Sequence, residues 1–190
     1  MKMKEKEKKG LIIVDVQNDF CPGGALPVPK GDEVVPVINK LIEKDNFDLI
    51  VATLDWHPEN HCSFVENGGP WPKHCIQNTF GAAFHPNLKV GKNWIIVKKA
   101  FLPEKDAYSG FEGKDDSGRG LIEILKIHHI RKIVVVGLAT EYCVKATALD
   151  GIKYGFEVIV IKKGIRAVNV HPNDEEKAIE EMKNAGIKII

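Results

Sequence analysis

The stretch from Lys132 to Lys162, KIVVVGLATEYCVKATALDGIKYGFEVIVIK, decides the fold class of this chain. Its two ends, KIVVVG and EVIVIK, are short continuous apolar runs, which are typical of strands buried on both faces of a sheet. The segment between them, TEYCVKATALDGIKYG, is predicted to be a helix. Two buried strands joined through a helix form a parallel pair, because the connection crosses over one face of the sheet. The stretch therefore predicts an α/β fold.

The rest of the chain repeats this alternation of apolar runs and helical patterns. Four further strands are predicted, at residues 10–17, 48–56, 94–100 and 187–190. Three further helices are predicted, at residues 32–45, 117–129 and 171–186, the second beginning at Ser117 or a neighbour. We therefore expect one domain over residues 1–190, with a six-stranded, mainly parallel, doubly wound sheet and helices on both faces. In this prediction residues 1–9 form a charged N-terminal extension.

Composition and charge limit the function classes. The chain has 27 Lys and Arg against 26 Asp and Glu, and this balance does not favour nucleic acid or an anionic membrane as its main partner. Its start, MKMKEKEKKG, lacks the apolar core of a signal peptide, and no apolar run approaches the ~18–20 residues that span a bilayer. We therefore expect a cytoplasmic protein, and a homo-oligomer is compatible with it. In a reducing compartment its four cysteines are expected to be free thiols, ligands or nucleophiles.

Chemically active side chains follow the predicted strands. In doubly wound sheets the ligand site lies beyond the carboxyl ends of the strands, where this sequence places Asp15, the pair Lys98 and Lys99, and Cys143. A charge within an apolar run, as at Asp15, costs free energy unless it is partnered. With Thr140 as the N-cap, Cys143 lies in a first helical turn, which favours a thiolate of low pKa. A purely structural cysteine, a hydrogen-bonded structural aspartate and solvated lysines are the alternatives, and spacing alone does not choose between the two lysines.

A possible metal site follows the second strand. Asp55 and His57 alternate with a tryptophan, so their side chains lie on the same side if the strand geometry persists. Either His61 or His74, in the loop that follows, could supply a third ligand. The irregular spacing favours an open catalytic site over a closed structural one. An Asp and two His ligands suit zinc, iron or manganese.

The remaining cysteines and glycine-rich segments give weaker signals. Cys62 and Cys75 leave a structural zinc site open as an alternative, and Cys21 has no predicted role. Neither a Walker loop nor a G-x-G-x-x-G motif follows a predicted strand, so the sequence does not favour nucleotide binding.

Five segments together resemble one known family. They are IIVDVQNDFCPGGALPV (12–28), ATLDWHPENHCSF (52–64), GGPWPKHCIQNTFGAAFHP (68–86), KKAFLPEKDAYSGFEG (98–113) and VVGLATEYCVKATALD (135–150). Through them the chain resembles, along nearly its full length, the nicotinamidases of the isochorismatase-like (cysteine hydrolase) superfamily. The combination is much more specific than any one segment.

The resemblance implies roles for particular residues. The implied catalytic triad is Asp15, Lys99 and Cys143. The implied ligands of one divalent metal ion, zinc in the first place and otherwise iron or manganese, are Asp55, His57 and His74, with His61 as a further candidate. The implied walls of the substrate pocket are Phe20 and Trp71. The bond between Leu138 and Ala139 is expected to be a cis peptide, with the backbone N–H groups of Ala139 and Cys143 as oxyanion donors.

The resemblance also implies an activity. The chain is expected to be a metal-dependent cysteine amidohydrolase that converts nicotinamide to nicotinate and ammonia in NAD salvage, and that also accepts pyrazinamide. Two alternatives remain at this point. One is an amidase of the same superfamily that acts on a ureido or carbamoyl substrate, and the other is a non-catalytic binding domain of the same fold.

Overall fold

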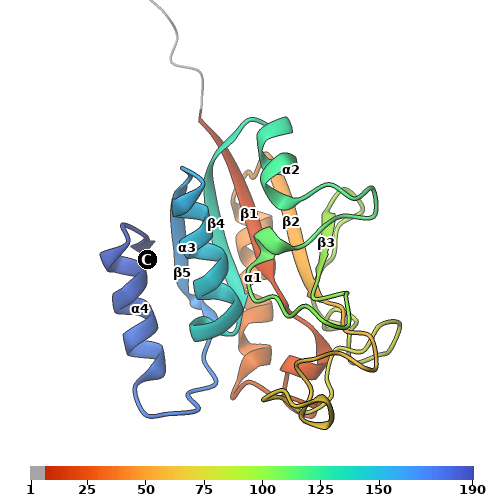
Figure 1. The fold of residues 1–190 in the computed structure, drawn as a ribbon. Helices are drawn as coiled ribbons and strands as arrows, with labels where there is room; N and C mark the ends of the chain where they lie inside the picture. The colour runs from red at the N-terminus through yellow and green to blue at the C-terminus, as the bar shows by residue number, and fades with distance from the viewer. Residues whose placement is uncertain (1–6) are drawn as a thin grey trace, which may run out of the picture.

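The computed structural model describes residues 7–190, which form a single parallel sheet flanked by helices (Figure 1). The strands are β1 (Lys8–Val14), β2 (Leu49–Asp55), β3 (Ile95–Lys99), β4 (Ile130–Leu138), β5 (Glu157–Arg166) and β6 (Lys188–Ile189). Their order across the sheet is β3-β2-β1-β4-β5-β6, and every neighbouring pair is parallel. The predicted six-stranded α/β sheet is confirmed, and it is parallel throughout.

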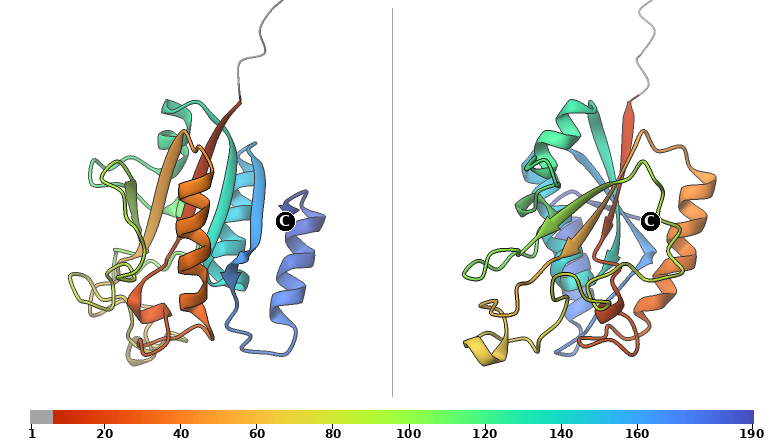
Figure 2. Two further views of the ribbon diagram at one scale, coloured as in Figure 1. Left: turned by 180° about the vertical axis from the view of Figure 1, so that it is seen from behind. Right: turned by 90° about the vertical axis from the view of Figure 1, so that its right-hand side faces the viewer.

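Helices cover both faces of the sheet, as predicted (Figure 2). They are α1 (Val34–Lys44), α2 (Leu121–Ile127), α3 (Lys145–Lys153) and α4 (Asp174–Asn184). One face carries α1, whose Val35 and Ile38 belong to the same apolar cluster as Leu11 and Ile13 of β1. The opposite cluster contains Ile12 and Val14 of β1 together with residues of α2, α3 and α4. From Leu11 to Val14, strand β1 is therefore apolar without alternation, because both of its faces are buried there.

Several boundaries differ from the predictions. Strand β1 ends at Val14 rather than at Gln17, and α3 begins at Lys145 rather than at Thr140. The charged extension expected over residues 1–9 ends earlier, because Lys8 and Lys9 already pair with β4, while residues 1–6 lie outside the described residues. Helix α2 begins at Leu121 rather than near Ser117, since the Asp115 carboxylate accepts the Ser117 backbone N–H and folds this segment into a turn. Strand β5 continues to Arg166, beyond the predicted EVIVIK run.

The strand order places a switch point at β1. The chain moves from β1 through β2 to β3 on one side, and β4 then returns to pair with β1 on the other side. Side chains at the carboxyl ends of these central strands converge beside that point, where open α/β sheets bind their ligands. Within residues 7–190, no helix is long and apolar enough to cross a membrane.

Candidate active site

Three predicted residues meet at the carboxyl ends of the central strands. Asp15 directly follows β1 and has a φ of 47°, which turns the chain out of the strand. Lys99 is the last residue of β3, and Cys143 lies in the helical turn after β4. Asp15 and Lys99 are completely buried, and Cys143 is 5% exposed. Two charged groups buried side by side require mutual pairing, and the distances show that they have it.

Lys99 is the centre of this group. Its Nζ lies 2.9 Å from Asp15 Oδ2 and also donates to Asp55 Oδ1. The same nitrogen is 3.4 Å from Cys143 Sγ and 3.3 Å from the carbonyl oxygen of Ala107. Burial disfavours the cation, but the two carboxylates outweigh burial and raise the pKa of Lys99 well above its ordinary value. The ammonium group is therefore charged at neutral pH.

The structure distinguishes Lys99 from its neighbour Lys98. Successive side chains of a strand point to opposite sides, so the two lysines diverge. Lys98 Nζ forms a 2.9 Å ion pair with the exposed Asp116 and lies over the Trp56 ring. Lys98 is thus the solvated strand-end lysine that the sequence left as an alternative.

Thr53 of β2 fixes the carboxylate of Asp15. Its hydroxyl donates to Asp15 Oδ1 at 2.6 Å and accepts the Asp15 backbone N–H at 3.2 Å. Asp15 Oδ2 has the Lys99 ion pair but no hydrogen bond, and one carboxylate oxygen lies within 4.8 Å of Cys143 Sγ. Burial is the largest influence on the pKa of Asp15 and raises it, while the Lys99 cation lowers it. The arrangement leaves one carboxylate oxygen free to accept a proton from the thiol.

The surroundings of Cys143 correct two expectations. Burial raises the pKa of the thiol well above its ordinary value, and the Lys99 cation offsets only part of this, so the predicted low-pKa thiolate is wrong. At rest Cys143 is a neutral thiol. The predicted Thr140 N-cap is also wrong: Ala139 takes the cap position, and the buried Thr140 hydroxyl has no hydrogen-bond partner. The bond between Leu138 and Ala139 is cis, as predicted.

Asp55, His57 and His74 lie together beside this group. Each offers one ligand atom, and these three atoms lie within 4.8 Å of one another. Nδ1 of His57 is 3.0 Å from the His74 carbonyl oxygen, and Nδ1 of His74 is 2.7 Å from the Pro72 carbonyl oxygen. A ring nitrogen that faces a carbonyl oxygen carries a proton, so in the neutral form of each ring Nε2 keeps its lone pair. His74 Nε2 is 4.0 Å from Asp55 Oδ2, which places this nitrogen beside a carboxylate.

These donors fit a divalent metal ion. A ligating histidine must be neutral and commonly donates its other N–H to a carbonyl or carboxylate, as both rings do here. Burial, reinforced by the neighbouring His74, lowers the pKa of His57 to about 3, so that ring is neutral at physiological pH.

The other candidate ligands lie outside the Asp55 group. Both ring nitrogens of His61 are engaged, Nδ1 with the Ser63 hydroxyl at 2.7 Å and Nε2 with the Lys105 carbonyl oxygen at 3.1 Å. His61 belongs instead to a second possible metal-binding group, which shares His57 and includes Asp106. Over the part of the chain that the structure describes, the possible metal-binding groups include neither Cys62 nor Cys75. The alternative of a structural zinc site at these cysteines therefore has no support.

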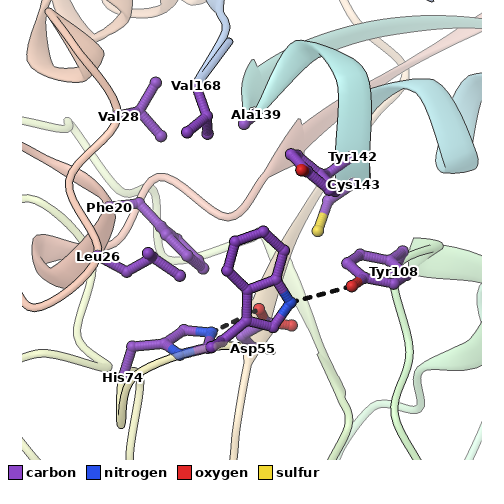
Figure 3. Close-up of a pocket in the computed structure, with 11 residues that line it drawn as sticks. Phe20, Leu26, Val28, Asp55, His74, Tyr108, Ala139, Tyr142, Cys143 and Val168 are labelled. Carbon is purple, nitrogen blue, oxygen red and sulfur yellow. Dashed lines mark hydrogen bonds and ion pairs between the residues drawn. The ribbon is translucent and has the colours of Figure 1, made fainter. Parts of the chain in front are cut away.

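A pocket opens directly onto Cys143, Asp55 and His74 (Figure 3). Its empty volume is about 410 Å³, a value that includes open solvent at the mouth. Both predicted wall residues, Phe20 and Trp71, line it. Ala139, a predicted oxyanion donor, also lines it, and the lining is completed by residues that the sequence analysis did not identify: Leu26, Val28, Tyr108, Tyr142 and Val168.

An aromatic group closes one side of the pocket. The indole N–H of Trp71 donates to the Tyr108 hydroxyl at 3.0 Å, and the Trp71 and Tyr142 rings meet edge to face with centroids 5.2 Å apart. The sequence held a usable signal for Tyr142, because it directly precedes Cys143. The opposite end of the pocket is aliphatic, where Val28 and Val168 lie near Ala139 (Figure 3). The pocket thus offers flat apolar walls with ionisable groups at one end.

Comparison with known proteins agrees with this geometry. Residues 9–190 match the isochorismatase domain family. A nicotinamidase of Escherichia coli is 41% identical, with 94% of this chain and 92% of that protein covered. The crystal structure of a Pyrococcus horikoshii pyrazinamidase in complex with zinc is 51% identical with a TM-score of 0.86, covering 96% of this chain and 98% of that chain. The crystal structure of PnC1 from L. infantum in complex with nicotinate is 38% identical with a TM-score of 0.89, covering 96% of this chain and 92% of that chain.

Proposed function

The chain belongs to the isochorismatase family, and from that premise we propose that it is a nicotinamidase, which hydrolyses nicotinamide to nicotinate and ammonia and also accepts pyrazinamide. One observation carries the proposal: a buried carboxylate, ammonium and thiol lie beside a carboxylate–histidine group at the end of one flat-walled pocket. The nicotinamidase and pyrazinamidase relatives support the same activity.

In the proposed reaction Cys143 is the nucleophile and Asp15 moves the protons. As Sγ bonds to the carboxamide carbon, Asp15 Oδ2 takes the thiol proton, and the carbonyl oxygen becomes an oxyanion. When the carbon–nitrogen bond breaks, Asp15 returns the proton to the leaving ammonia. Asp15 then takes a proton from water as the water oxygen attacks the thioester. The carbon–sulfur bond breaks, the proton returns to Cys143, and nicotinic acid leaves and loses its carboxyl proton to solvent to give nicotinate.

Lys99 favours the carboxylate form of Asp15, which is the form that accepts a proton. Its pKa is raised, so it carries a positive charge beside both the carboxylate and the sulfur. That charge offsets part of the effect of burial on the pKa of Asp15 and so favours the ionised carboxylate, and it stabilises the thiolate character that develops on Cys143 during attack. The backbone N–H groups of Ala139 and Cys143 are the proposed donors to the oxyanion, from the chain segment that precedes and begins the helical turn.

Asp55, His57 and His74 are the proposed ligands of one divalent ion, with zinc first and iron or manganese as the alternatives. When bound, this ion supplies a Lewis acid that holds the pyridine nitrogen of the substrate. The zinc complex of the Pyrococcus horikoshii relative and the free Nε2 atoms of both histidines support this part of the proposal. Phe20 and Trp71 pack against the two faces of the aromatic ring.

The alternatives lack comparable support. A non-catalytic binding domain would have no reason to keep a buried lysine between two carboxylates and a thiol. An amidase for ureido or carbamoyl substrates would need the triad but not the histidines. The cellular role that we propose is NAD salvage in the cytoplasm, a location to which four free cysteines are suited.

The direct test is ammonia release from nicotinamide by the purified protein, with the metal content measured on the same sample. The proposal requires release that depends on a bound divalent ion. A metal-loaded, folded protein that releases ammonia from a carbamoyl substrate but not from nicotinamide would contradict it.

Loss of the Thr53 hydroxyl is expected to slow the chemical step. Thr53→Val should lower kcat about 10- to 100-fold with little change in KM, because the Asp15 carboxylate loses the donor that orients it while the pocket walls are unchanged. Thr53→Ser keeps the hydroxyl and should restore most of kcat. Steady-state kinetics on both variants check this. Wild-type kcat in a folded Thr53→Val protein would show that the hydroxyl does not orient the base.

A further inference from the structure

Strand β2 extends past the point where β1 stops pairing with it. The register between the two strands runs from Gly10 opposite Leu49 to Ile13 opposite Ala52. On its other edge β2 continues to Asp55, which pairs with Lys99. Because Asp15 turns the chain away with a positive φ, β1 offers no backbone partner to the Asp55 peptide groups. A buried N–H and C=O at that position need another partner.

The side chain of Gln17 is that partner. Its Oε1 accepts the Asp55 backbone N–H at 2.9 Å, and its Nε2 donates to the Asp55 carbonyl oxygen at 2.8 Å. The second hydrogen of Nε2 goes to the Ala82 carbonyl oxygen at 2.9 Å. The side chain is completely buried. The amide therefore takes the place of the missing strand, and its three bonds allow only one orientation of the group.

Asp55, which Gln17 holds in this way, connects the catalytic group around Lys99 with the histidines of the proposed metal site. Asp55 Oδ1 accepts from Lys99, while Oδ2 faces His74 Nε2 at 4.0 Å. A change in the Asp55 backbone would move both oxygens, because the carboxylate is only one bond beyond Cβ. We propose that Gln17 is a positioning residue that sets the Asp55 carboxylate for the metal ion and so sets the affinity of the site. This inference rests on the metal site of the proposed function.

The test is the zinc affinity of Gln17→Met, a substitution that keeps the length of the side chain but removes its hydrogen bonds. Zinc-loaded full-length protein is titrated with a chromophoric chelator of known affinity. Partners that orient a ligand typically account for 10- to 100-fold in metal affinity, so the variant is expected to bind zinc about 10- to 100-fold more weakly. Gln17→Asn, whose amide is too short to reach both Asp55 groups, should also bind more weakly.

Asn39→Leu is the matched control. The Asn39 amide also spans a backbone N–H and a carbonyl, donating to Asn87 O at 2.8 Å and accepting from Lys89 N at 2.9 Å, but it lies on α1 away from the pocket. Its loss should lower Tm and leave zinc affinity unchanged. Measuring Tm for all variants separates a loss of stability from a loss of affinity.

Each outcome decides the inference. If Gln17 is only structural, Gln17→Met will lower Tm and keep zinc affinity within about twofold of wild type, well short of a ligand-orienting effect, and the inference fails while the metal site stands. If Gln17→Met does not fold, the zinc affinity of Gln17→Asn is compared with that of the wild type in the same way, and a value within about twofold contradicts the inference. A wild-type protein that binds no zinc, iron or manganese would overturn the metal site and this inference together.

Discussion

Cys143→Ala is expected to abolish amide hydrolysis, lowering kcat by roughly 10⁴- to 10⁶-fold, as loss of a catalytic nucleophile does in other hydrolases. The Sγ atom is the only nucleophile among the pocket-lining residues that also lies beside a base and a cation, with Lys99 Nζ at 3.4 Å. The substitution removes one buried atom and leaves the Asp15–Lys99 ion pair in place. Ammonia release from nicotinamide measures the effect, and circular dichroism verifies that the variant is folded.

The other three cysteines provide the controls. None of Cys21, Cys62 and Cys75 is bonded to Lys99 or Asp15, and each is a free thiol. Their alanine variants should therefore keep substantial activity. Cys62→Ala is the most informative, because Cys62 is partly exposed and its loss leaves no fully buried cavity. A Cys143→Ala protein with near wild-type kcat would refute the thioester mechanism.

Much of the fold followed from the sequence, because burial on both faces leaves a direct pattern. Val14, Val51 and Val135 lie in uninterrupted apolar runs, and each belongs to the core of the sheet. The position of the site followed from the same reasoning, since parallel strands bring their carboxyl ends to one edge. The strand boundaries were less accurate, because Asp15 ends β1 through its φ, which the residue type does not announce.

The features of the site that could not be predicted from the sequence depend on contacts between distant segments. Tyr108 and Val168 line the pocket only because loops after β3 and β5 fold back beside β1 and β4. The pKa of Cys143 was predicted in the wrong direction because a local rule for helix starts ignores burial, which is the larger effect here. Gln17 resembles any polar residue after a strand until the register shows that its amide replaces backbone pairing.

Benzamide is expected to be a much poorer substrate than nicotinamide, with kcat/KM lower by about 10²-fold or more. The two amides have the same shape and the same scissile bond, and the pocket walls Phe20 and Trp71 should accept both rings equally. Benzamide lacks the ring nitrogen whose lone pair the proposed ion would bind. Without that anchor the carbonyl carbon is not held over Cys143, and the rate that depends on orientation is lost. Pyrazinamide, which keeps a nitrogen at the same ring position, should react well.

His57→Ala should remove this preference as well as lower the rate, because it deletes one of the three proposed ligands of the ion. His85→Ala is the matched control, since His85 lines a different pocket and its Nδ1 accepts the Asn87 backbone N–H at 3.2 Å. The measurement is kcat/KM for nicotinamide, pyrazinamide and benzamide with the metal-loaded wild type and both variants. Equal values for nicotinamide and benzamide in the wild type would mean that the ring nitrogen is not recognised. The histidines would then serve another purpose, and an amidase for carbamoyl substrates would become the better description of the site.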